Sequence, residues 1–285
     1  MSPANPGPWV NPEIVEAQPW KSHDGIVKFF EFPVPIAAMS SRAFHLYWQK
    51  HHSPQVMHLT AFSQFMRKYL STHRYPGTPV ALPNRYELMG RAEGAAEVWL
   101  NRISEVGDWL GHPLYPELIQ PDEPRFIAQD GSAELVITKE ERIFRSETDL
   151  PENLATKVYL IASRGPNQDY DSFHLKASDY GKAIYQEPVL GRHLTQLIVN
   201  HRLRDPLPLE GFEFAKIDAI FELWFADLGA ANRFFAEPEF GKLATAHEEG
   251  LCEGRALRAL TVKVRVVHDE FSFQPSTTQP LPFSW

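Results

Sequence analysis

Cysteine is almost missing from this sequence: Cys252 is the only one among 285 residues. A single cysteine cannot close a disulfide within the chain, which suits a reducing compartment. The first residues contain no basic stretch followed by an apolar core, so they do not resemble a secretory signal. No apolar run approaches the ~18 residues that a membrane-spanning helix requires. We therefore expect a cytoplasmic protein that does not span a membrane.

Positive charge is also scarce, because 28 Lys and Arg residues face 36 Asp and Glu residues and give a formal net charge of -8. A nucleic-acid-binding face needs clustered Lys and Arg, and the sequence has no such run. The hydrophobic content of 43% and the charged content of 22% are ordinary for a globular protein. We expect one or two domains that bind a small-molecule substrate rather than nucleic acid.

The chain lacks the sequence motifs that commonly hold a metal or a nucleotide. It has no HExxH motif, no cysteine pair, no P-loop and no GxGxxG, and it has no GxSxG nucleophile motif. We therefore expect no metal and no cofactor. Candidates for catalysis must come from the 12 histidines, the tyrosines and the acids.

Four segments of the first half of the chain return in the second half in the same order. Three of the pairs lie 125 positions apart and one lies 128 positions apart. The pairs are 71–74 with 199–202, 97–100 with 222–225, 112–115 with 237–240, and 135–139 with 260–264. One such match could arise by chance, but four in order indicate two copies of one structural unit.

Within each copy, the apolar pattern predicts the order strand, helix, strand, strand, helix, strand. In the first copy we predict strands at 26–35, 64–73, 95–102 and 133–144 and helices at 40–52 and 104–118. In the second copy we predict strands at 157–163, 194–202, 219–225 and 256–268 and helices at 178–186 and 229–243. This βαββαβ order is the ferredoxin-like arrangement of an α+β fold.

The strand at 220–225 is apolar on both faces, so one face must pack under helices and the other against a second sheet. We predict two fused ferredoxin-like units, at 25–146 and 155–270, that form one α/β barrel within the chain. The arms at 1–24 and 271–285 are rich in proline and aromatic residues. We expect these arms to lie across the barrel or to clasp a neighbouring subunit, and the second arrangement would make the protein a homodimer.

Several of these segments also resemble a known family. The stretch FHLYWQKHHSP at 44–54 is similar to the EthD-type helix that ends in His-x-Pro, and RKYLSTH at 67–73 is similar to the strand that follows it. ELWF at 222–225, followed by EPEF at 237–240, resembles the third strand and its Pro–aromatic segment. The chain thus resembles a tandem EthD-type member of the dimeric α/β-barrel superfamily. The resemblance implies the fold but not the reaction, because this superfamily includes decarboxylases, dehydratases, isomerases, cyclases, cofactor-free oxygenases and haem proteins.

His52 is the leading catalytic candidate. A residue before proline disfavours helical backbone, so we expect the first helix to end just before Pro54. The negative end of the helix dipole would then raise the pKa of His52 and prepare it for acid–base work. The alternative is a histidine that only caps the helix. In the second copy Glu187 stands near the corresponding position, so we expect one competent site, in the first copy.

Three neighbours on the same helix are further candidates. Tyr47 could act in catalysis by donating a hydrogen bond to a substrate oxygen. Trp48 could form a wall of the substrate pocket or belong to the core. His51 lies about 100° around the helix from His52, so at most one of the two points deep into a cleft, and His51 is a candidate for substrate binding.

The strands contribute the remaining candidates. His73 and His201 end matching strands, where they could line the pocket or serve packing, and His73 is the second catalytic candidate. Arg74 and Arg91 could hold a substrate carboxylate. Trp99 could line the pocket, although a core position is the alternative.

These residues favour a cofactor-independent lyase, of decarboxylase or dehydratase type, or an isomerase that acts on a small hydrophobic, aromatic carboxylic acid. His52 or His73 would move a proton, and an aromatic pocket would exclude water. One alternative is a haem- or oxygen-dependent oxidoreductase with a histidine as axial haem ligand. Another is a protein that binds a hydrophobic metabolite without changing it.

Overall fold

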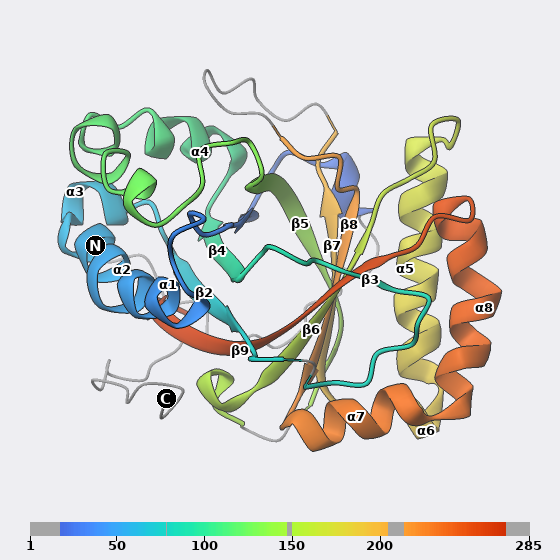
Figure 1. The fold of residues 1–285 in the computed structure, drawn as a ribbon. Helices are drawn as coiled ribbons and strands as arrows, with labels where there is room; N and C mark the ends of the chain where they lie inside the picture. Colours follow the sequence, from blue (N-terminus) through green and yellow to red (C-terminus); the bar gives the residue numbers. More distant parts are fainter. Residues whose placement is uncertain (1–17, 78, 147–149, 205–213, 272–285) are drawn as a thin grey trace.

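The computed structural model describes residues 18–77, 79–146, 150–204 and 214–271, and in this part of the chain eight antiparallel strands close into a barrel (Figure 1). The first four strands stand in the order β2-β4-β1-β5 and the second four in the order β7-β8-β6-β9. Pairing of β5 with β7 and of β2 with β9 closes the barrel. The strands are β1 (Val27–Phe32), β2 (Lys68–Arg74), β4 (Gly94–Leu100), β5 (Glu134–Arg145), β6 (Thr156–Ala162), β7 (Leu194–Arg202), β8 (Ala219–Phe225) and β9 (Arg258–Asp269).

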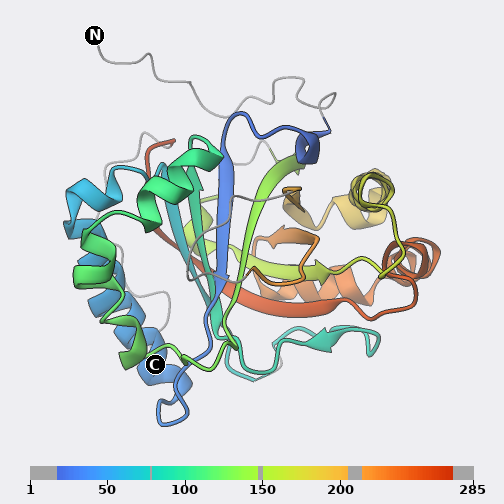
Figure 2. The same cartoon turned by 90° about the horizontal axis from the view of Figure 1, so that it is seen from above.

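Helices cover the outside of each half of the barrel, and the two groups lie on opposite sides (Figure 2). The first unit carries α1 (Ser41–Tyr47), the π-helix η3 (Trp48–His52), α2 (Ser53–His58), α3 (Thr60–Ser63), α4 (Ile103–Leu110), the π-helix η4 (Tyr115–Ile119) and the short η5 (Glu123–Arg125). The second carries α5 (Tyr170–Gln186), α6 (Pro188–Gly191), α7 (Leu228–Ala236) and α8 (Pro238–Cys252). Short 3-10 turns, η2 (Pro19–Lys21) and η6 (Glu152–Leu154), lie before β1 and β6.

The predicted α+β fold of two ferredoxin-like units in one barrel is confirmed, but the structure differs from the prediction in four local features. The first helical run continues through Pro54 instead of ending before it. The predicted helix at 104–118 is broken into α4 and η4. A short extra strand, β3 (Glu87–Leu88), pairs in parallel with β9. Helix α5 also begins earlier than the sequence pattern indicated, because Asp169 caps it by accepting a hydrogen bond from Ser172 N.

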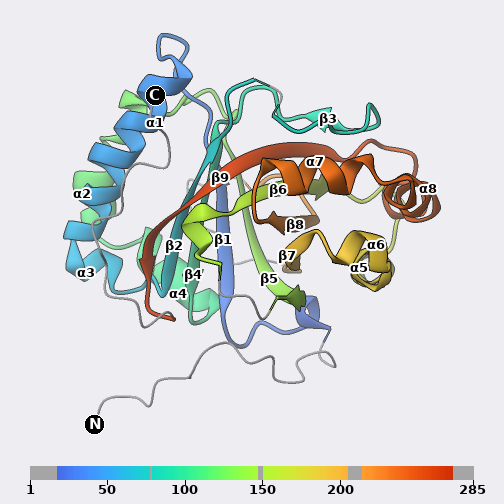
Figure 3. The same cartoon turned by 90° about the horizontal axis from the view of Figure 1, so that it is seen from below.

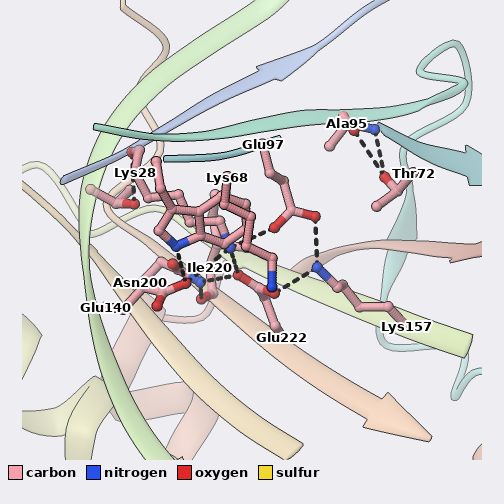
Figure 4. Close-up of polar contacts among 12 residues, drawn as sticks. Lys28, Lys68, Thr72, Ala95, Glu97, Glu140, Lys157, Asn200, Ile220 and Glu222 are labelled. Carbon is pink, nitrogen blue, oxygen red and sulfur yellow. Dashed lines mark hydrogen bonds and ion pairs between the residues drawn. The ribbon is translucent and has the colours of Figure 1, made fainter. Parts of the chain in front are cut away.

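Two lysines and two glutamates form a closed ring of charges inside the barrel (Figure 4). Lys28 Nζ lies 2.5 Å from Glu97 Oε2, and Lys157 Nζ lies 2.6 Å from Glu97 Oε1 and 2.7 Å from Glu222 Oε2. Lys28 also contacts Glu222 and closes the ring. All four side chains are at most 1% exposed. Burial opposes the charge on Lys28, but the surrounding carboxylates raise its pKa above the ordinary value.

The ring repeats with the units, since Lys28 and Lys157 occupy the same place in β1 and β6 and Glu97 and Glu222 the same place in β4 and β8. Each ammonium also lies over an indole ring, Lys28 at 4.1 Å from the Trp99 centroid and Lys157 at 4.0 Å from that of Trp224. Trp99 therefore points into the barrel rather than into a substrate pocket. Cation–π contacts and ion pairs together satisfy charges that water cannot reach.

Of the two arms, the structure describes residues 18–24 and residue 271. Trp20, in η2, is buried, and its ring centroid lies 4.5 Å from that of His201. This contact places the end of the first arm against the barrel. Residues 1–17 and 272–285 lie outside the described residues. No helix in the described ranges is both long and apolar enough to cross a membrane.

Removing one charge of the ring should strongly destabilise the fold. Lys157→Met leaves Glu97 and Glu222 buried with one cation between them, and we expect a loss of about 3–5 kcal/mol in the free energy of unfolding, measured by urea titration. Lys157→Met combined with Glu222→Leu keeps the interior neutral and should recover much of that loss. Lys242→Met, at a 76% exposed lysine, should change stability by less than about 0.5 kcal/mol. Equal effects at Lys157 and Lys242 would contradict the structural role of the ring.

Candidate active site

A cavity of about 440 Å³ lies between the outer face of the first sheet and the helices that cover it. Its walls come from β1, β2, β4 and β5 on one side and from α2, α3, α4 and η4 on the other. Most of the lining is apolar or aromatic, including Phe29, Val56, Phe62, Met66, Val98, Trp109 and Ile119. The polar side chains among the lining residues include Glu31, His52, Tyr69, Tyr115 and Glu123. A cavity with these aromatic and aliphatic walls and a few polar groups can hold an aromatic ligand.

His52 lines this cavity and is oriented by a carboxylate. Its Nδ1 lies 3.0 Å from Oδ2 of Asp122, and Oδ1 of the same carboxylate accepts a 2.5 Å hydrogen bond from the Tyr47 hydroxyl. The hydrogen bond from His52, followed by that from Tyr47, lowers the pKa of Asp122 below its usual value. In the neutral imidazole, a proton on Nδ1 leaves Nε2 as the basic nitrogen. Asp122 was missed in the sequence, because it stands far from His52 along the chain.

His52 lines the cavity, but its physical setting differs from the predicted helix end. His52 does not lie at a helix terminus, since the chain passes from η3 directly into α2. The Ser53 N–H donates to the Trp48 carbonyl, which is the wider spacing of a π-helix. Pro54 is the second residue of α2 and directly follows this π-turn, at the kind of irregularity where a helix commonly accommodates proline. The partner of His52 is therefore Asp122 and not the helix dipole.

Glu31 and Glu123 form a second polar group in the cavity, and the sequence analysis did not identify them. Burial raises the pKa of Glu31 to about 7. Burial, with a further contribution from the charge of Glu31, raises the pKa of Glu123 to about 8. The Tyr115 hydroxyl donates to both oxygens of Glu123, at 3.0 and 3.2 Å. One signal was present: Glu31 shares with Phe29 the face of β1 that packs under the helices, where an acid is unusual.

The other helix candidates lie around the cavity and not in its lining. Tyr47 holds Asp122, so it supports His52 through the carboxylate. Trp48 is buried and donates from Nε1 to the Tyr69 hydroxyl at 3.0 Å. His51 is exposed, and its ring lies 5.1 Å from that of Tyr47.

The strand-end histidines form separate, duplicated pairs. His73 Nδ1 lies 2.8 Å from Nδ1 of His45, and its Nε2 lies 3.2 Å from the Ser71 hydroxyl. His201 Nδ1 lies 3.0 Å from Nδ1 of His174, and its Nε2 lies 3.0 Å from Glu141. Burial is the largest cause that lowers the pKa of both His73 and His201, which favours neutral rings. Neither histidine is among the residues that line the cavity.

The arginine candidates also lie elsewhere. Arg74 donates to the carbonyls of Met89 at 2.8 Å and Ala92 at 3.2 Å, and Arg91 is 60% exposed and pairs with Asp130. No Lys or Arg is among the described residues that line the cavity. A substrate carboxylate would therefore meet Glu31 and Glu123 without a permanent cation to balance it.

The second unit does not reproduce this site. His45 and His174 are 129 positions apart, whereas His73 and His201 are 128 apart, so the first unit contains one extra residue between them. The extra residue lies in the π-helix, since α2 and α5, and likewise α3 and α6, end 128 positions apart. By this count Tyr180, and not Glu187, corresponds to His52. Glu187 instead caps α6 by accepting from Val189 N.

The residues around the cavity do not fit haem. Haem carries two carboxylates, whereas the described lining supplies two acids and, apart from His52, no group that could become cationic. His73 and His201, the strand-end candidates for an axial ligand, have both ring nitrogens engaged. Across residues 18–77, 79–146, 150–204 and 214–271, no cluster of three His, Cys, Asp or Glu side chains could hold a metal ion.

The raised pKa values of Glu31 and Glu123 predict a stability that decreases with pH. The unfolded chain releases these protons near pH 4.5, whereas the folded protein keeps them until about pH 7 to 8. The free energy of unfolding should therefore fall between pH 5 and 8. Glu31→Gln should make this decline shallower, by up to about 1.4 kcal/mol per pH unit, in urea titrations at several pH values. Glu117→Gln, at an exposed acid, is the control, and equal slopes for wild type and Glu31→Gln would show that the prediction is wrong.

Comparison with known proteins agrees with this architecture. The EthD domain family matches residues 37–130, which contain α1 to η5 with β2, β3 and β4 and none of the second unit. No curated protein matches the sequence significantly.

Among solved structures, an anthrone oxidase-like protein superposes over 90% of this chain and 98% of its own, with a TM-score of 0.52 and 8% identity. A protein from Fusobacterium nucleatum, described as a candidate monooxygenase, covers 87% of this chain and 94% of its own at 7% identity, with a TM-score of 0.48. A chlorite dismutase from Candidatus Nitrospira defluvii covers 86% and 93% at 12% identity, with a TM-score of 0.41. At these identities the likeness concerns the fold alone. Residues 37–130 match the EthD domain family, and the whole chain shares its fold with the anthrone oxidase-like protein.

Proposed function

We propose that this protein is an enzyme whose active site is the cavity of the first unit, with His52 as the group that moves a proton. The observation that carries the proposal is the His52–Asp122 pair, which opens onto an aromatic cavity of about 440 Å³. The reaction we favour is a cofactor-independent isomerisation or dehydration of an aromatic substrate. Both reactions begin with removal of a proton next to an electron-withdrawing group, which a positioned histidine accelerates.

The residues have separate roles in this scheme. Asp122 fixes the Nδ1–H tautomer, so Nε2 of His52 accepts the substrate proton and Asp122 stabilises the imidazolium that forms. Burial raises the pKa of Glu31 to about 7 and that of Glu123 to about 8, so near neutral pH Glu123 is mostly protonated and Glu31 is partly protonated. The O–H of a protonated carboxyl group in an apolar site can donate a hydrogen bond to a substrate oxygen that gains negative charge, and the carbonyl oxygen of the same group can still accept one. The acid and the base are thus supplied by two different side-chain pairs.

This arrangement changes the substrate expected from the sequence. A decarboxylase would have to admit a carboxylate beside two acids, without Lys or Arg among the described lining residues. A neutral aromatic ketone, enol or phenol avoids that cost. We therefore propose a neutral substrate in place of the aromatic carboxylic acid.

Oxidation by dioxygen is a second candidate that shares the first step. Removal of a proton by His52 would give an enolate or phenolate, which can pass electrons to dioxygen without a metal. The anthrone oxidase-like neighbour has a name that refers to this kind of chemistry, although its similarity supports only the fold. Dioxygen uptake distinguishes the two candidates.

Exchange of the acidic C–H protons of anthrone with solvent deuterium, followed by NMR, tests the proposal. Wild-type protein should accelerate the exchange, and His52→Ala should reduce that acceleration by ~10²–10⁴-fold. Asp122→Asn should also reduce it and should change its pH dependence, because the imidazole loses its partner. His73→Ala, at a buried histidine outside the cavity, is the matched control and should retain the activity if circular dichroism shows it folded.

The proposal fails if His52→Ala exchanges anthrone protons as fast as the folded wild type. Binding of anthrone with no exchange above the buffer rate would instead support a protein that only sequesters its ligand. Consumption of dioxygen in step with exchange would favour the oxidative candidate over isomerisation.

A further inference from the structure

Each unit contains a buried acid at the same position of the repeat, but the surroundings of the two acids differ. Glu123 and Glu248 are 125 positions apart, as are Glu97 and Glu222 before them and the first residues of α4 and α7. Both acids lie between the helices and the outer face of their sheet. Burial is the largest cause that raises the pKa of each. Glu248 therefore shows what the second unit places around the acid that, in the first unit, lines the cavity.

In the second unit, two phenols fill the space around this acid. The hydroxyl of Tyr86 donates to Glu248 Oε1 at 2.6 Å, and that of Tyr180 donates to the same oxygen at 2.7 Å. The Tyr86 ring packs in the core of the second unit, 6.4 Å from the Phe240 ring, and is only 7% exposed. Tyr180 belongs to α5 and corresponds to His52, so it is part of this unit's own helix layer.

Tyr86, in contrast, comes from the first unit. The connection between β2 and β4 runs across to the helices of the second unit (Figure 3). It is attached there by Ala81 N to Asn232 Oδ1 at 2.9 Å, by Arg85 to the Thr245 hydroxyl at 3.2 Å, and by β3 alongside β9. The Tyr86 side chain thus comes from the first unit but packs in the core of the second unit, where it takes the place that a bound phenol could occupy.

The first unit leaves the corresponding place open. Among the described residues, the side-chain hydrogen bonds to Glu123 both come from Tyr115, which lies in the unit's own helix layer. The cavity occupies the space beside this acid, and its remaining lining is mostly aromatic and aliphatic. A second donor on an aromatic ring would complete for Glu123 the arrangement that Tyr86 completes for Glu248.

We propose that the cavity of the first unit binds a phenol, and that the phenolic hydroxyl donates a hydrogen bond to Glu123 as Tyr86 does to Glu248. This inference rests on the proposed function in taking the same cavity as the active site, and it specifies the substrate class as a hydroxylated aromatic ring. Recognition by a buried acceptor selects phenols over ethers of the same shape, because an ether leaves the acceptor without a donor. A benzoate is disfavoured, because its carboxylate has no proton to donate to the acceptor and meets no Lys or Arg among the described lining residues.

Calorimetry on the full chain with p-cresol, 4-methylanisole and p-toluate tests the inference. We expect wild-type protein to bind p-cresol at least about tenfold more tightly than 4-methylanisole, and p-toluate more weakly than p-cresol. Glu123→Leu should remove the preference for p-cresol over the ether. Glu123→Gln keeps an acceptor oxygen and should retain the preference, which separates the loss of the acceptor from a loss of folding. Equal binding of p-cresol and 4-methylanisole to wild type, or an unchanged preference in Glu123→Leu, would overturn the inference.

A second variant tests the comparison between the two units. Tyr86→Ala removes a phenol from the second unit, so p-cresol should bind at one more site per chain than in wild type and should raise the melting temperature further. A Tyr86→Ala protein with no additional p-cresol site would show that Tyr86 is not held as a ligand. These readouts are binding measurements and do not depend on His52. If wild type prefers p-cresol while His52→Ala retains activity, only the proposed proton transfer fails. If His52→Ala loses activity while wild type shows no preference for p-cresol, only the phenol assignment is overturned.

Discussion

The ring of Lys28, Glu97, Lys157 and Glu222 is the interaction on which the rest of the structure depends. Each unit supplies one lysine and one glutamate, and each lysine pairs with a glutamate of both units. In one unit alone, each lysine would lose one of its two glutamate partners. A buried ion without its partners costs several kcal/mol, so the ring favours the complete barrel. The ring therefore couples the two sheets in one register, as the closing pairs β5–β7 and β2–β9 also do. Two copies that could have formed a dimer are held as one barrel.

Because the barrel interior fixes the sheets, the helix layers outside it could diverge. In the first unit the helix run contains a π-turn, and the second helical stretch is broken between α4, η4 and η5. In the second unit α5 and α8 are continuous, and the corresponding space is filled by a hydrophobic core that includes Tyr86 and Tyr180. Irregular helices pack less closely, so the cavity and the irregularity occur on the same side of the molecule. The π-turn also carries His52, so this irregularity of the helix lies at the proposed site.

The sequence allowed the fold to be predicted because the repeat and the strand pattern are local signals. It also identified His52, from the helix motif. The rest of the site could not be predicted in the same way, because Asp122, Glu31 and Glu123 approach His52 only when the helices pack on the sheet. The end of the helix at Pro54 was predicted wrongly, since the rule for residues before proline is a tendency and the helical run continues through Pro54 after a π-turn. The repetition of His73 and His201 suggested a role at the site. In the structure each contacts a helix histidine of its own unit, His45 or His174, so the repeated feature is a pair of buried histidines.

A comparison of matched positions separates the residues of the common fold from those of the proposed site. Positions that keep their residue in both units, such as the ring and the histidine pairs, hold the common fold together. Positions that differ mark the site: His52 is matched by Tyr180, Asp122 by His247, and Glu31 by Leu160. The second-unit residues still touch each other, since the rings of Tyr180 and His247 stack at 5.4 Å where the first unit has the His52–Asp122 hydrogen bond. Glu123 and Glu248 are the same residue in both units, but their surroundings differ. Glu248 accepts hydrogen bonds from the hydroxyls of Tyr86 and Tyr180, whereas Glu123 lines the cavity. The duplicated fold thus contains one closed and one open version of the same binding geometry.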